Sequence, residues 1–436
     1  MRYSLYLLIL ALVVGESPAF AQQSGKTVRK HRQEVEDPVF TPALRQAEAA
    51  MDRKDYPAAE KDLLTVVDKN PQNYRAWFDL GFIYNETGRT PQAIEAYRKS
   101  TEANPQIFES TLNLGILLAR SNSPDAEKYL LAATKLKPSG KAEEGWYRAW
   151  LSLGEVLRDK KPTEAIEAFQ NAGKLKPTDA EPHLSAGLLL EQQQRFADAA
   201  LEYRRASELD PNSTEAWAGM VNAYSKLGQF AEAEQPLRKY ISLNPNNATA
   251  HVQLGRLLLA QKKSDEAAAE FEKGLQAKPG DLEAQKEIIG IYIGQKLYKN
   301  AEPHLASALR ANPNDPQLHH WYGLAMLGQK RPAEAQAALL NAAKLNPRSG
   351  EIYADLAIAA SENKNYPLII QALDARAKFL PELPATYYLR ATAYDHLRAP
   401  KEAIANYKQF LAAADGKFPN EEWKARQRIL AIEPKK

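Results

Sequence analysis

Cysteine is absent from the 436-residue sequence. Its absence excludes disulfide bonds, thiolate metal sites and cysteine nucleophiles, and also the acylated cysteine that anchors a bacterial lipoprotein. An excess of charge of one sign is absent as well, because 57 Lys and Arg residues oppose 54 Asp and Glu residues and the formal net charge is only +3. A nucleic-acid partner is therefore not expected.

Long apolar runs are also missing, and the one notable run, Leu5 to Val14, lies at the N-terminus. It has about half of the roughly 20 residues that a transmembrane helix needs. The tripeptide Ala19-Phe20-Ala21 follows it and has the form of a cleavage site before Gln22. We therefore predict a signal peptide at 1–21 and an exported, soluble chain, periplasmic or secreted, with no membrane span. A retained N-terminal anchor is the alternative.

Residues 22–39 form a polar N-terminal segment, which we expect to be a solvated tail. Its basic residues are Lys26, Arg29, Lys30, His31 and Arg32. The rest of the chain has no composition shift and no long linker rich in Pro, Gly or Ser. It is therefore interpreted as one repetitive body.

Proline recurs at a nearly fixed interval along this body. It occupies positions 71, 105, 138, 177, 211, 245, 279, 313, 347 and 381, at intervals of 34 residues except for one of 33 and one of 39. Twelve residues before each of these prolines stands an alanine, with Ile369 as the one departure. Each interval is interpreted as two antiparallel helices joined by a short turn, such as Glu86 to Arg89, with the proline ending the second helix.

One interval also carries a recognisable side-chain pattern. The pattern W-x2-L-G-x2-Y, A-x3-F, P is matched by Trp77, Leu80, Gly81, Tyr84, Ala93, Tyr97 and Pro105. In this respect the sequence resembles the tetratricopeptide repeat family over residues 40–415. The resemblance implies an all-α, right-handed superhelical solenoid of about eleven helix-turn-helix hairpins. Residues 416–436 are expected to form a C-terminal capping helix and tail, with Trp423, Ile429 and Leu430 covering the last hairpin.

Two departures from the pattern have expected consequences. We call the position of Gly81 and its equivalents the glycine slot, and its small residue lets the second helix approach closely. Val221 and Ile289 occupy this slot in two repeats, so a wider helix spacing is expected there, which Gly219 and Gly290 relieve. The 39-residue interval holds Ser139 to Gly145, expected as a longer loop or an extra helical turn.

Motifs that carry catalysis are not found. The sequence contains no H-E-x-x-H, G-x-S-x-G, Walker or G-x-G-x-x-G motif. His183, His251 and His319 stand at the position of Trp77, here called the tryptophan slot, two repeats apart from one another. They are therefore interpreted as packing residues that cannot share a metal. No catalytic residue, cofactor or metal is predicted, and the protein is not expected to be an enzyme.

The resemblance also implies where a partner would bind. In the family, the first helix of each hairpin lines a concave wall that contacts peptides. The corresponding positions carry an apolar stripe of Phe78, Phe82, Leu112, Ile116, Leu151, Leu184 and Leu188. This stripe is interpreted either as a binding surface for an apolar segment or as extended hairpin packing. Farther along the chain the positions turn polar, before His320 and Trp321, so a second surface is expected there.

Part of a carboxylate clamp, which some family members use to hold a chain end, is also present. Asn113 and Arg148 match two of its positions, but Phe78 and Phe82 stand where a lysine and an asparagine are required. Capture of a chain end is therefore not favoured. An apolar segment in extended or helical form suits these residues better.

The function favoured by these observations is a non-enzymatic scaffold or adaptor that binds segments of other cell-envelope proteins. The alternative is a subunit of a polysaccharide synthesis or export apparatus that contacts glycan. The placement of Trp146, Trp321 and the tyrosines discriminates between them. Aromatic rings on the wall favour sugar, whereas rings buried between helices favour a protein partner.

Overall fold

The computed structural model describes residues 41–433, and within this range every regular element is a helix. The predicted signal peptide (1–21), the polar segment (22–39) and the last residues of the predicted tail lie outside the described residues. None of the helices formed by residues 41–433 has the length and apolar character to cross a membrane.

The described residues form 23 helices, and the all-α prediction is confirmed. Their bounds are α1 Pro42–Asp52, α2 Tyr56–Lys69, α3 Tyr74–Glu86, α4 Thr90–Ala103, α5 Phe108–Arg120, α6 Ala126–Ala133, α7 Ala142–Leu157, α8 Pro162–Leu175, α9 Glu181–Gln192, α10 Phe196–Leu209, α11 Thr214–Lys226, α12 Phe230–Leu243, α13 Ala248–Ala260, α14 Ser264–Ala277, α15 Leu282–Gly294, α16 Tyr298–Ala311, α17 Pro316–Gly328, α18 Pro332–Leu345, α19 Gly350–Glu362, α20 Tyr366–Ala377, α21 Pro384–His396, α22 Pro400–Ala414 and α23 Pro419–Ile432. Consecutive helices pair as hairpins.

Local sequence signals explain where the hairpins turn. The predicted turn after α3 contains Gly88 at φ 75°, a left-handed conformation that glycine adopts without steric cost. The same hairpin begins with a side-chain N-cap. Asn73 accepts a hydrogen bond of 3.0 Å from the backbone N–H of Ala76, which satisfies a free donor at the start of α3. Pro71 lies between α2 and α3, as its inability to continue a helix requires.

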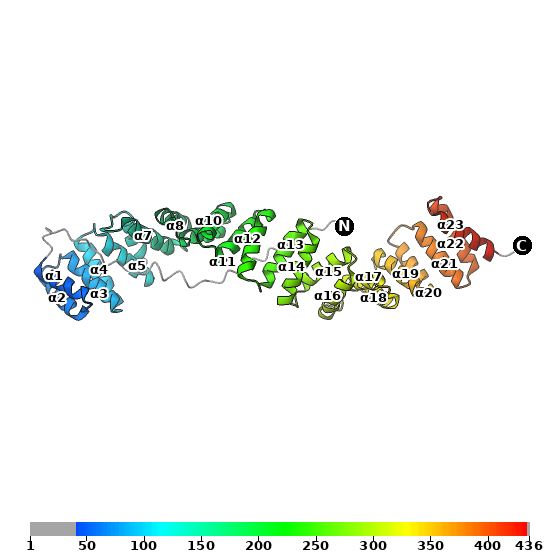
Figure 1. The fold of residues 1–436 in the computed structure, drawn as a ribbon, viewed down its shortest axis with the longest axis horizontal. Helices are drawn as coiled ribbons and strands as arrows, with labels where there is room; N and C mark the ends of the chain where they lie inside the picture. The colour runs from blue at the N-terminus through cyan, green and yellow to red at the C-terminus, as the bar shows by residue number, and fades with distance from the viewer. Residues whose placement is uncertain (1–40, 434–436) are drawn as a thin grey trace. The chain divides into compact units, whose positions relative to one another are not determined.

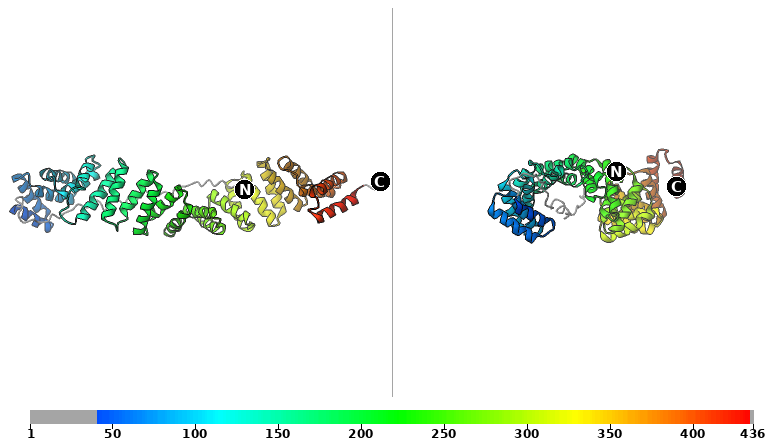
Figure 2. Two further views of the ribbon diagram at one scale, coloured as in Figure 1. Left: turned by 90° about the horizontal axis from the view of Figure 1, so that it is seen from above. Right: turned by 60° about the vertical axis from the view of Figure 1, so that its left-hand side comes forward.

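The chain divides into two compact units, which meet in sequence at Pro245 and Asn246. The first contains α1–α12 and the second contains α13–α23. Within the first unit the hairpins stack in chain order along a curved path (Figures 1 and 2). Some first helices also touch the first helix of the next hairpin, as α5 touches α7 and α9 touches α11. Such close spacing is what the inner wall of a curved stack requires.

The glycine slot has the role that the sequence predicts. A Cβ atom added to Gly81 would lie 2.7 Å from the ring of Tyr97, and one added to Gly154 would lie 2.7 Å from the ring of Phe169. In each case the ring comes from the second helix of the same hairpin. The slot therefore stays empty of side chain so that a large ring can be buried.

Where the slot is filled, the facing residue is smaller. Val221 and Ile289 are 3% and 0% exposed, and the fully buried residues sixteen positions later are Leu237 and Leu305 instead of aromatic residues. A larger residue in the slot of the first helix is thus matched by a smaller residue on the second helix, and the interior stays filled. Of the two glycines expected to give relief, Gly219 faces the ring of Tyr203, whereas Gly290 faces open space.

The 39-residue interval lengthens a helix. The first helix of that repeat, α7, has 16 residues, compared with 13 in α3 and α5. Both alternatives expected for this interval occur, because the connection before α7, residues 134–141, is also longer than the connection before α3, residues 70–73. The added turn places Trp146 so that its indole N–H donates a hydrogen bond of 2.7 Å to the carbonyl of Leu136.

The C-terminal helix α23 packs against α22, but with a different face from the one expected. Ala425 is fully buried, and Ile429 and Ile432 pack against the same cluster. Trp423 and Leu430 are 64% and 71% exposed, so the expectation that they cover the last hairpin is wrong. The expectation for Ile429 is confirmed, and Ala425 and Ile432 complete the contact.

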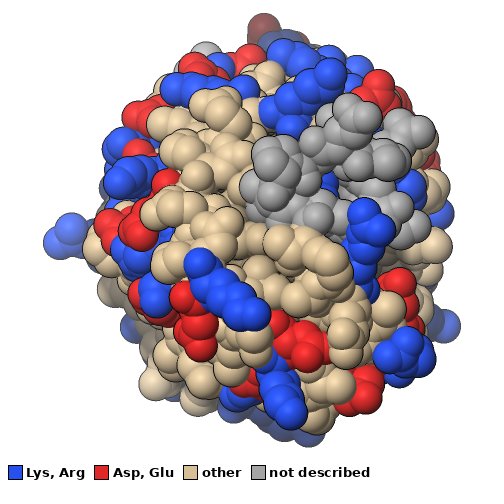
Figure 3. All heavy atoms as spheres, turned by 90° about the vertical axis from the view of Figure 1, so that its left-hand side faces the viewer, with Lys and Arg blue, Asp and Glu red and all other residues tan. Residues whose placement is uncertain are grey.

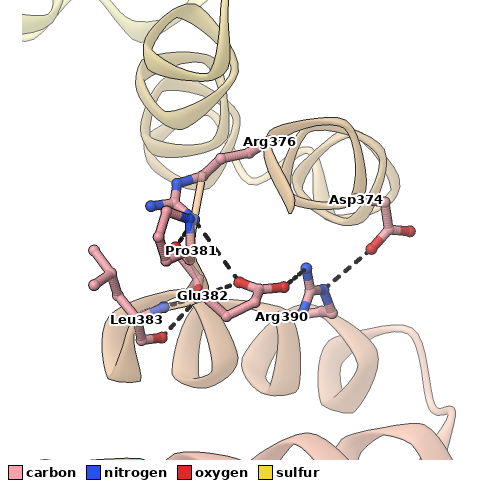
Figure 4. Close-up of polar contacts among 7 residues, drawn as sticks. Asp374, Arg376, Pro381, Glu382, Leu383 and Arg390 are labelled. Atoms are coloured by element: carbon pink, nitrogen blue, oxygen red, sulfur yellow. Dashed lines mark hydrogen bonds and ion pairs between the residues drawn. The ribbon is translucent and has the colours of Figure 1, made fainter. Parts of the chain in front are cut away.

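A buried ion network joins α20 to α21 (Figure 4). Arg376 and Arg390 are only 5% and 8% exposed. Glu382 lies between them and accepts a hydrogen bond of 2.8 Å from Arg390 Nη2, while its other oxygen lies 3.8 Å from Arg376 Nη1. The Nε of Arg390 also lies 3.2 Å from Asp374. The two carboxylates, Glu382 and Asp374, thus face the two guanidiniums at this joint.

Candidate functional site

The candidate site is the row of side chains on the first helices of the first unit. The seven predicted apolar residues lie at equivalent positions of α3, α5, α7 and α9. Most are buried: the exposed fractions are 4% for Phe78, 7% for Phe82, 0% for Leu112, 3% for Ile116 and 1% for Leu151. Leu184 and Leu188 on α9 are half-buried. Their role in binding stays a prediction.

Phe78 shows how closely this row adjoins the hairpin interior. Its ring is tilted against that of Tyr97, with 5.8 Å between centroids, and both residues belong to one buried cluster with Phe82. Phe78 and Phe82 therefore belong both to the predicted binding row and to the packed interior of the hairpin. The half-buried leucines of α9 separate the two roles better.

The two clamp residues have different surroundings. Asn113 on α5 is fully buried. Arg148 on α7 is half-buried, and among the described residues no hydrogen bond or ion pair to its guanidinium is found; its Nη2 is shielded from solvent. Burial lowers the pKa of Arg148, and the nearby Arg120 lowers it further, whereas Glu144 raises it. The lowering is thus an effect of burial, and the Glu144 carboxylate is the larger of the two charge influences.

Two serine hydroxyls beside this row also have no hydrogen-bond partner among the described residues. Ser152 and Ser185 are 5% and 0% exposed, and neither Oγ has a hydrogen-bond partner. Sequence reasoning missed both serines, although a signal existed. The position two residues after the tryptophan slot is polar in four successive repeats, where it holds Asp79, Asn113, Ser152 and Ser185.

The predicted second surface lies on α17 in the second unit. His320 Nε2 lies 2.6 Å from Asp355 Oδ2 on α19, so the ring is held by a carboxylate of the next first helix. Trp321 is half-buried beside it. The contact orients the imidazole, and the role of the two residues in binding stays a prediction.

The histidines of the tryptophan slot pair with groups inside the repeats. His183 Nδ1 lies 2.7 Å from Glu202 Oε2, and His251 Nδ1 lies 2.6 Å from Glu270 Oε2. In both hairpins the glutamate follows the histidine by 19 residues, on the second helix. His319 instead lies 2.8 Å from the carbonyl of Pro313. These partners agree with the interpretation as packing residues, and the recurring glutamate was not anticipated.

Comparison with known families decides what this architecture is. A family model described as "Cilia and flagella-associated protein 70 C-terminal domain", built of tetratricopeptide repeats, matches residues 35–288, more than half of the chain. A second model, "Tetratricopeptide repeat", matches residues 258–322. The chain belongs to the tetratricopeptide repeat family. The resemblance in the sequence is thereby confirmed.

Curated relatives match only in part. Peroxisome biogenesis protein 5 of Arabidopsis thaliana is 29% identical over 143 residues, which are 32% of this chain and 18% of that protein. The human RanBP2-like and GRIP domain-containing protein 3 is 26% identical over 155 residues, 35% of this chain and 9% of that protein. A UDP-N-acetylglucosamine–peptide N-acetylglucosaminyltransferase of Giardia intestinalis is 29% identical over 139 residues, 30% and 9%. The chain thus spans less than a fifth of these relatives.

Solved structures show weak likenesses. YrrB, described as a TPR protein with an unusual peptide-binding site, has a TM-score of 0.36 at 20% identity, covering 46% of this chain and 99% of YrrB. The C-terminal part of a TPR repeat-containing protein from Cytophaga hutchinsonii has a TM-score of 0.39 at 17% identity, covering 53% and 95%. Yeast Tom70 has a TM-score of 0.30 at 15% identity, covering 90% and 95%. Likenesses this weak say nothing about a ligand.

Proposed function

We propose that this protein is a non-enzymatic scaffold or adaptor that binds segments of partner proteins. The segments lie along α3, α5, α7 and α9, which are the first helices of four successive hairpins. The observation that carries the proposal is the row of apolar side chains at equivalent positions of these four successive helices. A row of regularly spaced apolar side chains suits a continuous peptide, because each repeat contacts one part of it.

The charge distribution supports a protein partner over nucleic acid. On the face drawn in Figure 3, Lys and Arg side chains alternate with Asp and Glu side chains. The composition agrees with this mixture, because the formal net charge is only +3. Nucleic-acid binding proteins instead gather basic residues on one face.

Burial of the aromatic residues favours the protein partner over glycan. Tyr97, Tyr203 and Tyr407 are among the largest fully buried side chains. The indole N–H of Trp146 is occupied by a backbone carbonyl. Sugar-binding surfaces expose aromatic faces for stacking, so these rings serve the interior. Glycan contact through the half-buried Trp321 remains the alternative.

The cell envelope is the proposed place of action, and it follows from the sequence of residues 1–21. A scaffold exported there would meet other envelope proteins. Mass analysis of the protein from intact cells tests this part of the proposal. A mature N-terminus at Gln22 supports export, whereas an N-terminus that retains residues 1–21 contradicts cleavage.

Site-specific photo-crosslinking tests the binding surface. A photoreactive residue at position 188, on the half-buried wall of α9, is expected to capture a partner protein. The matched control is position 201 on α10, where Leu201 is 52% exposed and lies on the second helix of the same hairpin. Capture of the same species from both positions would contradict a wall-specific surface, and capture of glycan alone would favour the alternative.

A further inference from the structure

The hairpin turns of the second unit repeat one basic residue. Each of its hairpins, from α13–α14 to α21–α22, turns through a residue in the left-handed backbone conformation, at φ between 56° and 64°. The backbone N–H of this residue closes the turn, as that of Lys296 does with a hydrogen bond of 3.1 Å to the carbonyl of Ile293. At intervals of 34 residues these positions hold Lys262, Lys296, Lys330, Lys364 and Arg398.

The turns do not need a basic side chain. Gly88 and Gly228 close two of the corresponding turns of the first unit, at φ 75° and 71°. Glycine adopts the left-handed conformation without steric cost, whereas any other side chain makes it less favourable. Lysine or arginine in all five turns of the second unit therefore strains the backbone where glycine would not, which indicates a role for the side chains.

The five basic side chains are exposed and unpaired. Within residues 41–433, none of them forms an ion pair or a side-chain hydrogen bond. The turns themselves, residues 261–263, 295–297, 329–331, 363–365 and 397–399, contain no acidic residue. Arg331, another basic residue of these turns, is in contrast paired with Glu302 and Glu334. Each turn thus offers an exposed cation with which no acidic group of the described chain is paired.

The five cations lie along one edge of the second unit, which we call the turn edge. Short connections make successive helices antiparallel, so the first helices all run the same way and their C-terminal ends lie on the same side (Figure 1). Neighbouring first helices touch, as α15 touches α17 and α17 touches α19. Because helices in contact lie about 8–10 Å apart, successive cations are on the order of 10 Å apart.

This spacing and the neighbouring residues define the partner. An extended polypeptide advances about 3.3 Å per residue, so an acidic side chain at about every third position matches the turn edge. Leu297, beside Lys296, and Leu397, beside Arg398, are 43% and 42% exposed. Apolar side chains between the acidic ones would contact these leucines, and a polysaccharide has none. Duplex DNA is disfavoured because it carries a charge about every 1.7 Å, far more densely than the turn edge.

We infer that the turn edge of the second unit binds an acidic, partly apolar segment of a partner protein. The inference goes beyond the proposed function, which concerns the first helices of the first unit. Each cation pairs with one carboxylate of the segment, so recognition depends on several weak, exposed ion pairs acting together.

Two fluorescent peptides of about fifteen residues test the turn edge. Both have acetylated and amidated ends; one repeats Glu-Leu-Ser and the other repeats Gln-Leu-Ser. Fluorescence anisotropy with the full chain at low salt is expected to show at least about tenfold tighter binding of the Glu peptide. Salt at about 0.5 M should remove the difference, because exposed charges are screened. Equal binding of the two peptides at low salt overturns the inference.

A triple variant separates the charges from the turns. Lys296→Gly, Lys330→Gly and Lys364→Gly together remove three cations and leave the residue that Gly88 and Gly228 provide in the first unit. Affinity for the Glu peptide is expected to fall about tenfold, while the melting temperature stays the same or rises. A melting temperature several degrees lower would show that the side chains support the fold, and an unchanged affinity would show that they do not bind the segment. Either result overturns the inference.

The matched control removes three exposed lysines at or beyond the ends of the second helices α18, α20 and α22, through Lys344→Gln, Lys378→Gln and Lys417→Gln. It lowers the net charge equally and should bind the Glu peptide as the unaltered chain does. An equal loss in both triple variants would show general charge attraction and would overturn the turn edge as a site. Binding of polygalacturonate, an anionic polysaccharide, without binding of the Glu peptide would overturn the assignment to a protein segment.

Discussion

Arg428 on α23 holds Asp395 on α21 through two hydrogen bonds, from Nε at 2.7 Å and from Nη2 at 2.8 Å. Asp395 also accepts a hydrogen bond of 3.3 Å from the hydroxyl of Tyr407 on α22. The Arg428 contact lowers the pKa of Asp395 below its usual range. Three successive helices are thus tied together at the C-terminal end of the second unit.

The contacts of α23 predict that two changes to this capping helix reduce stability by different amounts. Arg428→Ala should lower the free energy of unfolding by only about 1 kcal/mol, because the guanidinium is half exposed and such pairs are weak. Removal of residues from Glu421 onward should instead aggregate the protein or lower its melting temperature strongly, since it uncovers the cluster around Phe410. Calorimetry and light scattering check both. Equal, small effects would mean that α23 is not a cap.

The glycine slot predicts a sharp contrast between two glycines. Gly81→Ala places a methyl group about 2.7 Å from the Tyr97 ring and should cost about 1 to 3 kcal/mol of stability. Gly290→Ala meets no atom within 4 Å on another helix and should be neutral or stabilising by up to about 1 kcal/mol. Urea unfolding of both variants checks the pair. Equal destabilisation would show that helix packing does not depend on the slot.

The network at Glu382 predicts a large loss from a small change. Glu382→Gln keeps the shape but leaves Arg376 and Arg390 with too little negative charge, which should cost about 3 kcal/mol. Glu95→Gln, which alters an exposed pair with Lys99, should have little effect. Thermal melts of the two variants make the comparison. Similar melting temperatures would contradict the role of Glu382 in joining α20 to α21.

Glu181 at the start of α9 predicts a pH dependence. Burial, helped by Asp179 and Glu155, raises its pKa to about 7. The folded state disfavours ionisation of a carboxyl group whose pKa it raises. The contribution of Glu181 to stability therefore falls as the pH rises from about 4.5 through 7. Glu181→Gln should therefore raise the melting temperature at pH 8 and change it little at pH 4.5. A difference that does not depend on pH would contradict the shift.

The fold was predictable to a large extent, because its determinants are local and repeat. The prolines, the turn at Gly88 and the glycine slot at Gly81 each act within one hairpin, so their spacing predicted the helices. The contact face of α23 was not predictable in this way. Trp423 and Ala425 are two residues apart, and only the shape of the last hairpin decides which of them is buried.

The candidate site was predictable by position but not by contact. The pattern placed Phe78 and Leu188 on equivalent faces, yet it could not say that Phe78 packs against Tyr97 while Leu188 stays half-buried. The sequence also did not show which residues the histidines contact. His251 and Glu270 are distant in the sequence and meet only because the two helices run antiparallel at a fixed register.

The measurement that tests the central claim most directly is partner capture by Leu184→Glu with Leu188→Glu, two changes on the half-buried wall of α9. Charges there are solvated in the free protein, and covering them with an apolar segment costs several kcal/mol. The account predicts that affinity capture of the partner is lost while the melting temperature stays within a few degrees. Undiminished capture by the folded double variant would contradict binding along this wall.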